Sequence, residues 1–403
     1  MVWTTAVAIM WYSHTIGKFI PQGKARLLAI FPAILILLLL PLRLSLVLLG
    51  GPTSFILGWL STFKLLLFAL GKGPLTSDPP LSFSDFVPLS LLPIKKIQQH
   101  RSNPSNTQNN NNFGRCTKLP YEEVCYKLTN EASFILANEK DVFRSLEKNQ
   151  ITKKGQKSPL NYPYAIMVIV LAFLIPLNDK KEILHPKFTL LIYCLYMYIG
   201  LEFIFALISL FTRKVISIEI EPQFNEPYLS TSLQDFWGRR WNIMVNRILH
   251  PTVYSPVVSA SARFIGRRWA QMLGILATFA VSGLMHELIF YYIRMGESTW
   301  EPSWDSMCFF LLHGLCLAIE LAFKKVLKGR WQLPRLLSWP LTVVFMIYTA
   351  LWLFVPALVR CHVYEKASIE LNALNETLKD FYGALRFACF HMTSDEVVKN
   401  GPI

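Results

Sequence analysis

One predicted membrane helix carries a narrow polar stripe that ends in an imidazole. Thr278, Ser282 and His286 follow one another at intervals of four, and Gly283 lies on much the same side. The other faces carry Leu, Ile, Phe and Val. A small polar stripe suits a substrate cavity, and a neutral imidazole can take a proton from a hydroxyl group. The pattern favours His286 as a general base. The alternative is a histidine that only hydrogen-bonds a neighbouring helix.

Other ionisable residues also fall inside apolar runs, where a charge at mid-span costs about 2.5–3.5 kcal/mol on insertion scales. His313 and Glu320 lie two helical turns apart, on one face, and predict a polar contact between helices. Glu287 points about 100° away from the preceding imidazole, so we expect it to pair with an arginine or to orient another helix. We interpret Glu202 and Lys64 as structural, with Lys64 extending its ammonium group towards the membrane surface.

A second informative stretch precedes the histidine span. Ser232 can cap a helix. Apolar residues then recur at helical spacing: Phe236, Trp237, Trp241, Met244, Val245, Ile248 and Leu249. Basic and amide residues occupy the other sides: Arg239, Arg240, Asn242, Asn246 and Arg247. This pattern predicts an amphipathic helix in the membrane interface with aromatic anchors, where a phosphate-bearing soluble substrate would arrive.

Composition identifies the class of protein that must position these residues. Of 403 residues, 53% are apolar and only 16% are charged, whereas soluble domains carry roughly 25% charge. Composition excludes disorder, collagen and a small disulfide scaffold. The seven cysteines form no CxxC pair and no zinc pattern, so no metal is expected. The net charge of +14 is interpreted as a membrane feature rather than a sign of nucleic-acid binding.

The apolar runs predict an all-α, polytopic transmembrane bundle with about eight spans. They are Val2–Ile16, Leu27–Leu49, Thr53–Leu70, Tyr164–Leu177, Phe188–Phe211, Met272–Ile293, Met307–Phe323 and Leu336–Leu358. The first and fourth are marginal. The first has no basic region before it, which favours an uncleaved anchor over a signal peptide.

The loops alternate in charge. Those at 17–26, 72–163, 212–271 and 324–335 are rich in Lys and Arg and are therefore expected to be cytosolic. The loops at 178–187 and 294–306 and the tail after Arg360 lie on the other side. That tail contains a glycosylation sequon at Asn375, which is usable if the tail is lumenal.

Several of these segments together resemble the membrane-bound O-acyltransferase family, and within it the plant wax synthase branch. The resemblance rests on Pro222–Asn225, on Phe236–Asn242 (FWGRRWN), on Pro251–Tyr254 and on Ser282–Leu288 (SGLMHEL). It covers most of the chain. Further similar stretches are Phe63–Asp78, Leu160–Asn161 and His185–Pro186.

The resemblance implies acyl transfer from acyl-CoA to a lipid alcohol in the endoplasmic reticulum membrane, with no cofactor beyond the acyl-CoA co-substrate. It implies that His286 is the catalytic histidine and Asn242 its polar partner. Amide donors suit charge that develops on a carbonyl oxygen. Substrate contacts are expected from Trp237, Arg239, Arg240, Trp241 and Ser282. Arg239 and Arg240 would meet CoA phosphates or, equally, membrane headgroups.

Four regions are expected: N-terminal membrane helices (1–95), a cytosolic polar loop (96–160), the catalytic core (161–358) and a tail (359–403). Within the loop, 114–157 departs from the family pattern and is interpreted as an insertion. The expected activity is that of a long-chain-alcohol O-fatty-acyltransferase that makes wax esters. Its alternatives are a sterol or diacylglycerol acceptor, or a non-enzymatic lipid transporter or scaffold. No internal repeat typical of transporters is found.

Overall fold

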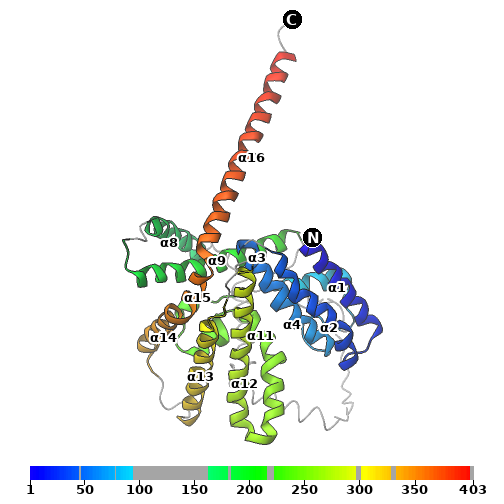
Figure 1. Cartoon of the computed structure of the whole chain (residues 1–403), viewed down its shortest axis with the longest axis vertical. Helices are drawn as coiled ribbons and strands as arrows, with labels where there is room; N and C mark the ends of the chain where they lie inside the picture. Colours follow the sequence, from blue (N-terminus) through cyan, green and yellow to red (C-terminus); the bar gives the residue numbers. More distant parts are fainter. Residues whose placement is uncertain are drawn as a thin grey trace, which may run out of the picture.

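The chain forms an all-α fold in its computed structural model, shown in Figure 1. The structure describes residues 1–44, 47–77, 79–93, 162–179, 183–215, 222–295, 301–327 and 333–399. Every regular element within these ranges is a helix. The predicted loop at 96–160 and its insertion lie outside the described residues.

Six stretches of the described chain are long and apolar enough to cross a membrane. They are Lys24–Arg43, Gly50–Ala69, Pro186–Lys214, Ile243–Ile293, Asp305–Val326 and Arg335–Arg360. The protein is therefore a polytopic membrane protein, as the sequence predicts. The two marginal spans form helices α1 (Val2–Phe19) and α8 (Tyr162–Asp179) but are not among the six.

The first part of the chain packs around an apolar core. Its elements are α1, α2 (Lys24–Leu39), η1 (Leu40–Arg43), α3 (Val47–Ser54), the π-helical turn η2 (Phe55–Ser61), α4 (Thr62–Ala69) and α5 (Phe83–Leu91). Met10, Leu37, Leu57 and Phe86 are almost fully buried in this core. The core holds η2 in place, and η2 carries Trp59 towards the second half of the chain.

Lys64 lies inside this core with no exposed surface. Its ammonium group donates hydrogen bonds to the carbonyl oxygens of Leu89 and Leu92, each at 2.6 Å. These carbonyls end α5, where a helix presents unpaired acceptors and partial negative charge. The structural interpretation of Lys64 is confirmed, but the expectation that it extends to the membrane surface is wrong. The sequence does not reveal that a distant helix ends beside it.

We expect Lys64→Met to destabilise the N-terminal core. The two carbonyl groups would lose their donor, and an unpaired buried acceptor costs about 1–3 kcal/mol. The thermal midpoint of the detergent-solubilised protein should fall by several degrees. Lys325→Met removes an exposed lysine on α13 and is the control. An equal midpoint for both variants would show that the Lys64 hydrogen bonds contribute nothing to stability.

Helix α12 (Ser255–Ile293) consists of two arms joined at Gly266, which has φ 75° and ψ 159°. Glycine adopts this backbone conformation without the steric cost of a Cβ atom. The arms pack closely: a Cβ atom on Gly274 would lie 2.7 Å from Cγ2 of Val258. The charge pattern predicts a cytosolic loop up to residue 271. In the structure the last part of this segment is the first arm and tip of a helical hairpin, and the second arm of that hairpin carries His286.

The predicted amphipathic helix is interrupted, so the expectation of one continuous helix is wrong. The segment contains η3 (Pro227–Leu229), α10 (Leu233–Asp235), the π-helical turn η4 (Phe236–Arg240), α11 (Ile243–Leu249) and the π-helical turn η5 (His250–Tyr254). Ser232 caps its start, as predicted, by accepting a hydrogen bond from the Asp235 amide. The break falls at Asn242, which has a left-handed backbone (φ 42°). The apolar residues of α11 are buried against Leu60, Trp59 and Met285.

The last helices complete the bundle around α12. They are α9 (Pro186–Val215), α13 (Asp305–Val326), α14 (Arg335–Thr349), the π-helical turn η6 (Ala350–Phe354) and α15 (Val355–Arg360). Two glycines let α13 approach α12: a Cβ atom on Gly283 would lie 2.6 Å from Sδ of Met307, and one on Gly314 would lie 2.9 Å from Cβ of Phe279. This contact fixes the register of α13 beside the second arm of α12.

Helix α16 (Val363–Lys399) projects away from the body of the protein (Figure 1). Two hydrogen-bonded links join its first turns to α12 and to α3. Lys366 Nζ donates to the carbonyl oxygen of Ile293 at 3.1 Å, at the end of α12. The Glu370 carboxylate accepts hydrogen bonds from the amides of Val47 and Leu48, at the start of α3. The Lys366 ammonium group lies at the C-terminal end of α12, and the Glu370 carboxylate lies at the N-terminal end of α3. The helix dipole favours a positive charge at the former and a negative charge at the latter.

Candidate active site around His286

The imidazole of His286 is oriented by its own helix. Nδ1 lies 2.7 Å from the carbonyl oxygen of Ser282, one turn earlier. A carbonyl oxygen only accepts, so Nδ1 carries the proton and Nε2 of the neutral ring presents a lone pair. Within the described part of the chain, Nε2 makes no hydrogen bond. This is the tautomer that a general base requires.

Three aromatic rings from three separate segments surround this imidazole. The ring centroids of Phe310, Trp59 and Phe354 lie 4.5, 5.4 and 5.6 Å from that of His286. Trp59 and Phe354 come from the π-helical turns η2 and η6, a type of turn that is frequent at functional sites. The rings limit the access of water, and a hydrogen bond to Nε2 is stronger in such surroundings than in water.

His313 is the second histidine in the bundle, and its environment is different. It is fully buried. Its Nδ1 accepts a hydrogen bond from the indole N–H of Trp237 at 3.2 Å, and its Nε2 lies 2.9 Å from Oγ1 of Thr349. That hydroxyl donates to the Phe345 carbonyl, so Nε2 of His313 is the donor. Both nitrogens are occupied, which confirms the predicted helix–helix contact and makes His313 a poor candidate for a base.

Glu320 also serves a structural contact. Its carboxylate accepts hydrogen bonds from the amides of Leu233 (2.8 Å) and Gln234 (3.4 Å) and pairs with Lys324. It thereby caps the start of α10, which leads into η4. The predicted polar contact of this face of α13 is confirmed for Glu320 as well.

Two other acidic residues in the spans have different partners. Glu202 accepts a hydrogen bond from the hydroxyl of Tyr198 at 3.0 Å, on its own helix. Glu287 is buried, and the amides of Ser306 and Met307, at the start of α13, interact with its carboxylate. This arrangement confirms the expectation that Glu287 orients another helix.

Asn242 sits where the chain leaves η4 and enters α11. The segment at 223–225 holds this junction: the Ile243 amide donates to the Gln223 carbonyl at 3.0 Å, and the Asn225 amide donates to the Arg240 carbonyl at 2.9 Å. Asn is one of the few residues that tolerate the left-handed conformation found here. Its Oδ1 atom is buried and has no hydrogen-bond partner among the described residues. An unpaired buried amide oxygen is costly, so this atom points to a ligand.

The helix that follows Asn242 packs against Trp59, a neighbour of the imidazole. Val245 and Leu249 of α11 share one buried cluster with Trp59 and Met285. Trp59 touches the ring of His286, and Met285 precedes it in the chain. The fold thus brings η2, α11 and α12 together at the junction between the N-terminal helices and the rest of the bundle.

The predicted substrate-contact residues have different surroundings. Arg240 is occupied: Nε pairs with Asp235 at 2.8 Å, and Nη1 donates to the Asn225 and Glu226 carbonyls. Arg239 is exposed, and no interaction is found for it among the described residues. Of these two arginines, Arg239 is therefore the one available to an anionic ligand.

The two tryptophans contribute mainly packing. Trp237 packs against Phe279, Phe309 and Phe310 in addition to its hydrogen bond to His313. Trp241 stacks on Phe236, with centroids 5.4 Å apart. Ser282 orients the imidazole through its carbonyl group. Substrate contact by any of these residues stays a prediction. Within the described residues, no cluster of His, Cys, Asp or Glu is arranged to hold a metal ion.

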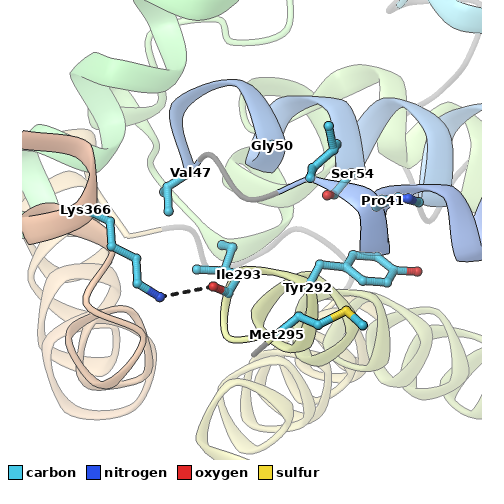
Figure 2. Close-up of a pocket in the computed structure, with 9 residues that line it drawn as sticks. Pro41, Val47, Gly50, Ser54, Tyr292, Ile293, Met295 and Lys366 are labelled. Carbon is cyan, nitrogen blue, oxygen red and sulfur yellow. Dashed lines mark hydrogen bonds between the residues drawn. The ribbon is translucent and has the colours of Figure 1, made fainter. Parts of the chain in front are cut away.

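A cavity of about 230 Å³ lies at the far end of α12. Figure 2 shows its lining, which combines apolar side chains with the Lys366 ammonium group. The ring of Tyr292 borders the cavity and also lies beside Gly58, the neighbour of Trp59. The Tyr292 hydroxyl donates to the Leu38 carbonyl at 2.6 Å. Tyr292 therefore lies between the cavity and η2, the turn that carries Trp59.

Comparison with known proteins adds to this geometry. Residues 220–312 match the Membrane bound O-acyl transferase family, and this range contains both Asn242 and His286. A long-chain-alcohol O-fatty-acyltransferase from Simmondsia chinensis is 39% identical over 95% of this chain and 96% of its own length. The acyl-CoA–sterol O-acyltransferase 1 of Arabidopsis thaliana is 38% identical over 92% of this chain and 93% of its own. A probable long-chain-alcohol O-fatty-acyltransferase 1 from Arabidopsis thaliana is 34% identical over 91% of this chain and 92% of its own.

Proposed function

Since the chain belongs to the membrane-bound O-acyltransferase family, we propose that it transfers a fatty acyl group from acyl-CoA to a long-chain alcohol, making a wax ester. The observation that carries this proposal is the state of His286. Its Nδ1–H is held by Ser282, its Nε2 is free, and aromatic rings surround it. In the proposed reaction the acyl group passes directly to the alcohol, so no covalent acyl-enzyme intermediate is needed.

The reaction follows from that tautomer. Nε2 of His286 takes the proton of the alcohol hydroxyl as the oxygen attacks the carbonyl carbon of the thioester. A tetrahedral intermediate forms, with negative charge on the former carbonyl oxygen. When it collapses, the carbon–sulfur bond breaks and the imidazolium returns its proton to the CoA thiolate. The products are the ester and free CoA, and the imidazole is again neutral.

Two further residues have proposed roles. The amide of Asn242 orients the alcohol, whose hydroxyl can donate to its unpaired, buried Oδ1, or donates through Nδ2 to the developing oxyanion. Arg239 contacts the phosphates of CoA. Its exposed position on η4, with no interaction found among the described residues, supports this role.

The acceptor defines the second candidate. The relative named as an acyl-CoA–sterol O-acyltransferase is as similar to this chain as the relative named for long-chain alcohols, which favours a sterol as the alternative. Diacylglycerol presents the same hydroxyl chemistry and ranks third. A scaffold or transporter would need neither Asn242 nor His286, and family membership speaks against it. We further propose that the protein resides in the endoplasmic reticulum membrane.

An acyl-transfer assay separates these acceptors. The chain is expressed in microsomes from cells that lack their own neutral-lipid acyltransferases, with labelled palmitoyl-CoA and a mixture of fatty alcohol, sterol and diacylglycerol. We expect labelled wax ester as the main product. Labelled sterol ester would assign the protein to the sterol class instead. No ester with any acceptor, from protein shown to be inserted and intact, would overturn the proposed function.

A further inference from the structure

The α12 hairpin ends in a tip formed by residues 263–269, with Gly266 at the turn. Two large aromatic side chains there are largely exposed: Phe264 is 87% exposed and Trp269 is 65% exposed. The surfaces of soluble proteins rarely expose large apolar side chains as a contiguous patch. At the interface of a bilayer, by contrast, aromatic rings are enriched because one end is apolar and the other is wet.

The same tip is basic. Arg263 and Arg268 flank the two aromatic residues, are exposed, and make no ion pair or hydrogen bond within the described residues. Lys325, at the end of α13, is also exposed. No acidic residue lies between Ser255 and Gln271. The tip therefore offers unpaired cations beside apolar rings, a combination complementary to the anionic headgroups of a membrane and the chains beneath them.

The length of the second arm of α12 supports placing the tip at a membrane surface. At a rise of about 1.5 Å per residue, the arm from Arg267 to Ile293 spans about 40 Å. A bilayer with its headgroup regions is about 40–45 Å thick. Helix α13 runs antiparallel beside this arm, and its basic end lies at the same side of the bundle as the tip in Figure 1. With Ile293 at one membrane surface, the tip reaches the headgroups of the opposite leaflet, which the charge pattern makes cytosolic.

We propose that the hairpin tip is a docking surface for anionic phospholipids of the cytosolic leaflet. Arg263 and Arg268 bind the phosphate and carboxylate groups, while Phe264 and Trp269 insert among the adjoining chains. Since α12 also carries His286, the occupied tip fixes the height of the catalytic helix relative to the membrane surface. The inference needs membrane insertion only and does not depend on which alcohol is acylated.

Lipid binding by the purified full-length chain tests the tip directly. The protein is titrated with dioleoyl phosphatidylserine in detergent, and bound lipids are counted by native mass spectrometry, with phosphatidylcholine as the neutral probe. An arginine near an anionic surface contributes about fivefold in affinity. Arg268→Gln should weaken phosphatidylserine binding about fivefold, and Arg263→Gln with Arg268→Gln by more than tenfold. Phosphatidylcholine binding should stay unchanged in all variants.

Lys379→Gln, which removes a cation from α16 at the opposite end of the molecule, is the matched control and should bind phosphatidylserine like the wild type. Unchanged phosphatidylserine counts in the double arginine variant would overturn the proposal. A second arm titrates palmitoyl-CoA in the same way. Several-fold weaker palmitoyl-CoA binding with intact phosphatidylserine binding would assign the tip to the CoA phosphates and equally overturn it. Neither readout requires acyl transfer, so failure of the proposed function is seen separately.

Discussion

His286→Ala is expected to lower kcat of acyl transfer by about 10²–10⁴-fold, the range for loss of a general base. Nε2 is the atom that would take the alcohol proton, and methyl replacement leaves no acceptor in its place. The backbone around it should hold, because among the described residues the ring makes one hydrogen bond, to its own helix. Initial rates with labelled palmitoyl-CoA in microsomes, normalised to inserted protein, measure the effect.

The second histidine supplies the comparison. His313→Ala would remove a buried side chain that joins Trp237 to Thr349, so we expect a lower thermal midpoint and less inserted protein. His286→Ala should show the opposite balance, with a normal amount of inserted protein and a strongly reduced kcat. If His286→Ala retained near-wild-type turnover per molecule, the imidazole would have no part in the reaction.

Asn242→Ala is the second large effect, with an expected loss of about 10²–10³ in kcat, as for other donors to an oxyanion. Alanine also disfavours the left-handed backbone at this position, at about 1–2 kcal/mol. Two companion variants separate the amide from the backbone. Asn242→Gly accepts the conformation but has no amide, and Asn242→Asp keeps an oxygen but has no N–H donor.

The pattern among the three variants decides the role of the residue. If the amide donates to the reaction, all three should be slow, while the glycine variant keeps the wild-type thermal midpoint. If the aspartate variant stays active, the side chain acts as an acceptor and orients the alcohol. Full activity of the glycine variant would show that Asn242 serves only the turn between η4 and α11.

Much of the candidate site could be predicted from the sequence, because spacing along a helix and the motif around it are local. His286 and its small polar stripe follow from the interval of four, and Asn242 follows from its motif. The rings of Trp59, Phe310 and Phe354 could not be predicted this way. They come from three distant segments, and nothing in the local sequence of each indicates that they converge on one imidazole.

Backbone geometry was the second feature that the sequence pattern could not predict. Helical periodicity continues through Asn242, so the pattern does not register the left-handed residue that splits the predicted helix. The turn at Gly266 is similar: basic and aromatic residues flank it on both sides, and only the folded backbone at Gly266, with the close approach of Gly274 to Val258, reveals two arms. Lys64 could not be interpreted correctly because its carbonyl partners lie on another helix, beyond a turn.

The hydrogen bonds that join α16 to α12 and α3 all lie in its first turns, so the two ends of this helix contribute differently to the fold. The part up to Glu370 connects two elements of the bundle. Lys366 is hydrogen-bonded to the end of the helix that carries His286, and Glu370 is hydrogen-bonded to the start of the helix that leads to Trp59. Beyond Glu370 the helix leaves the body (Figure 1). A fusion partner appended at the C-terminus therefore sits on a long stalk, remote from the reaction. A chain truncated before Glu370 loses a hydrogen-bonded link between the two halves of the bundle that meet at the imidazole.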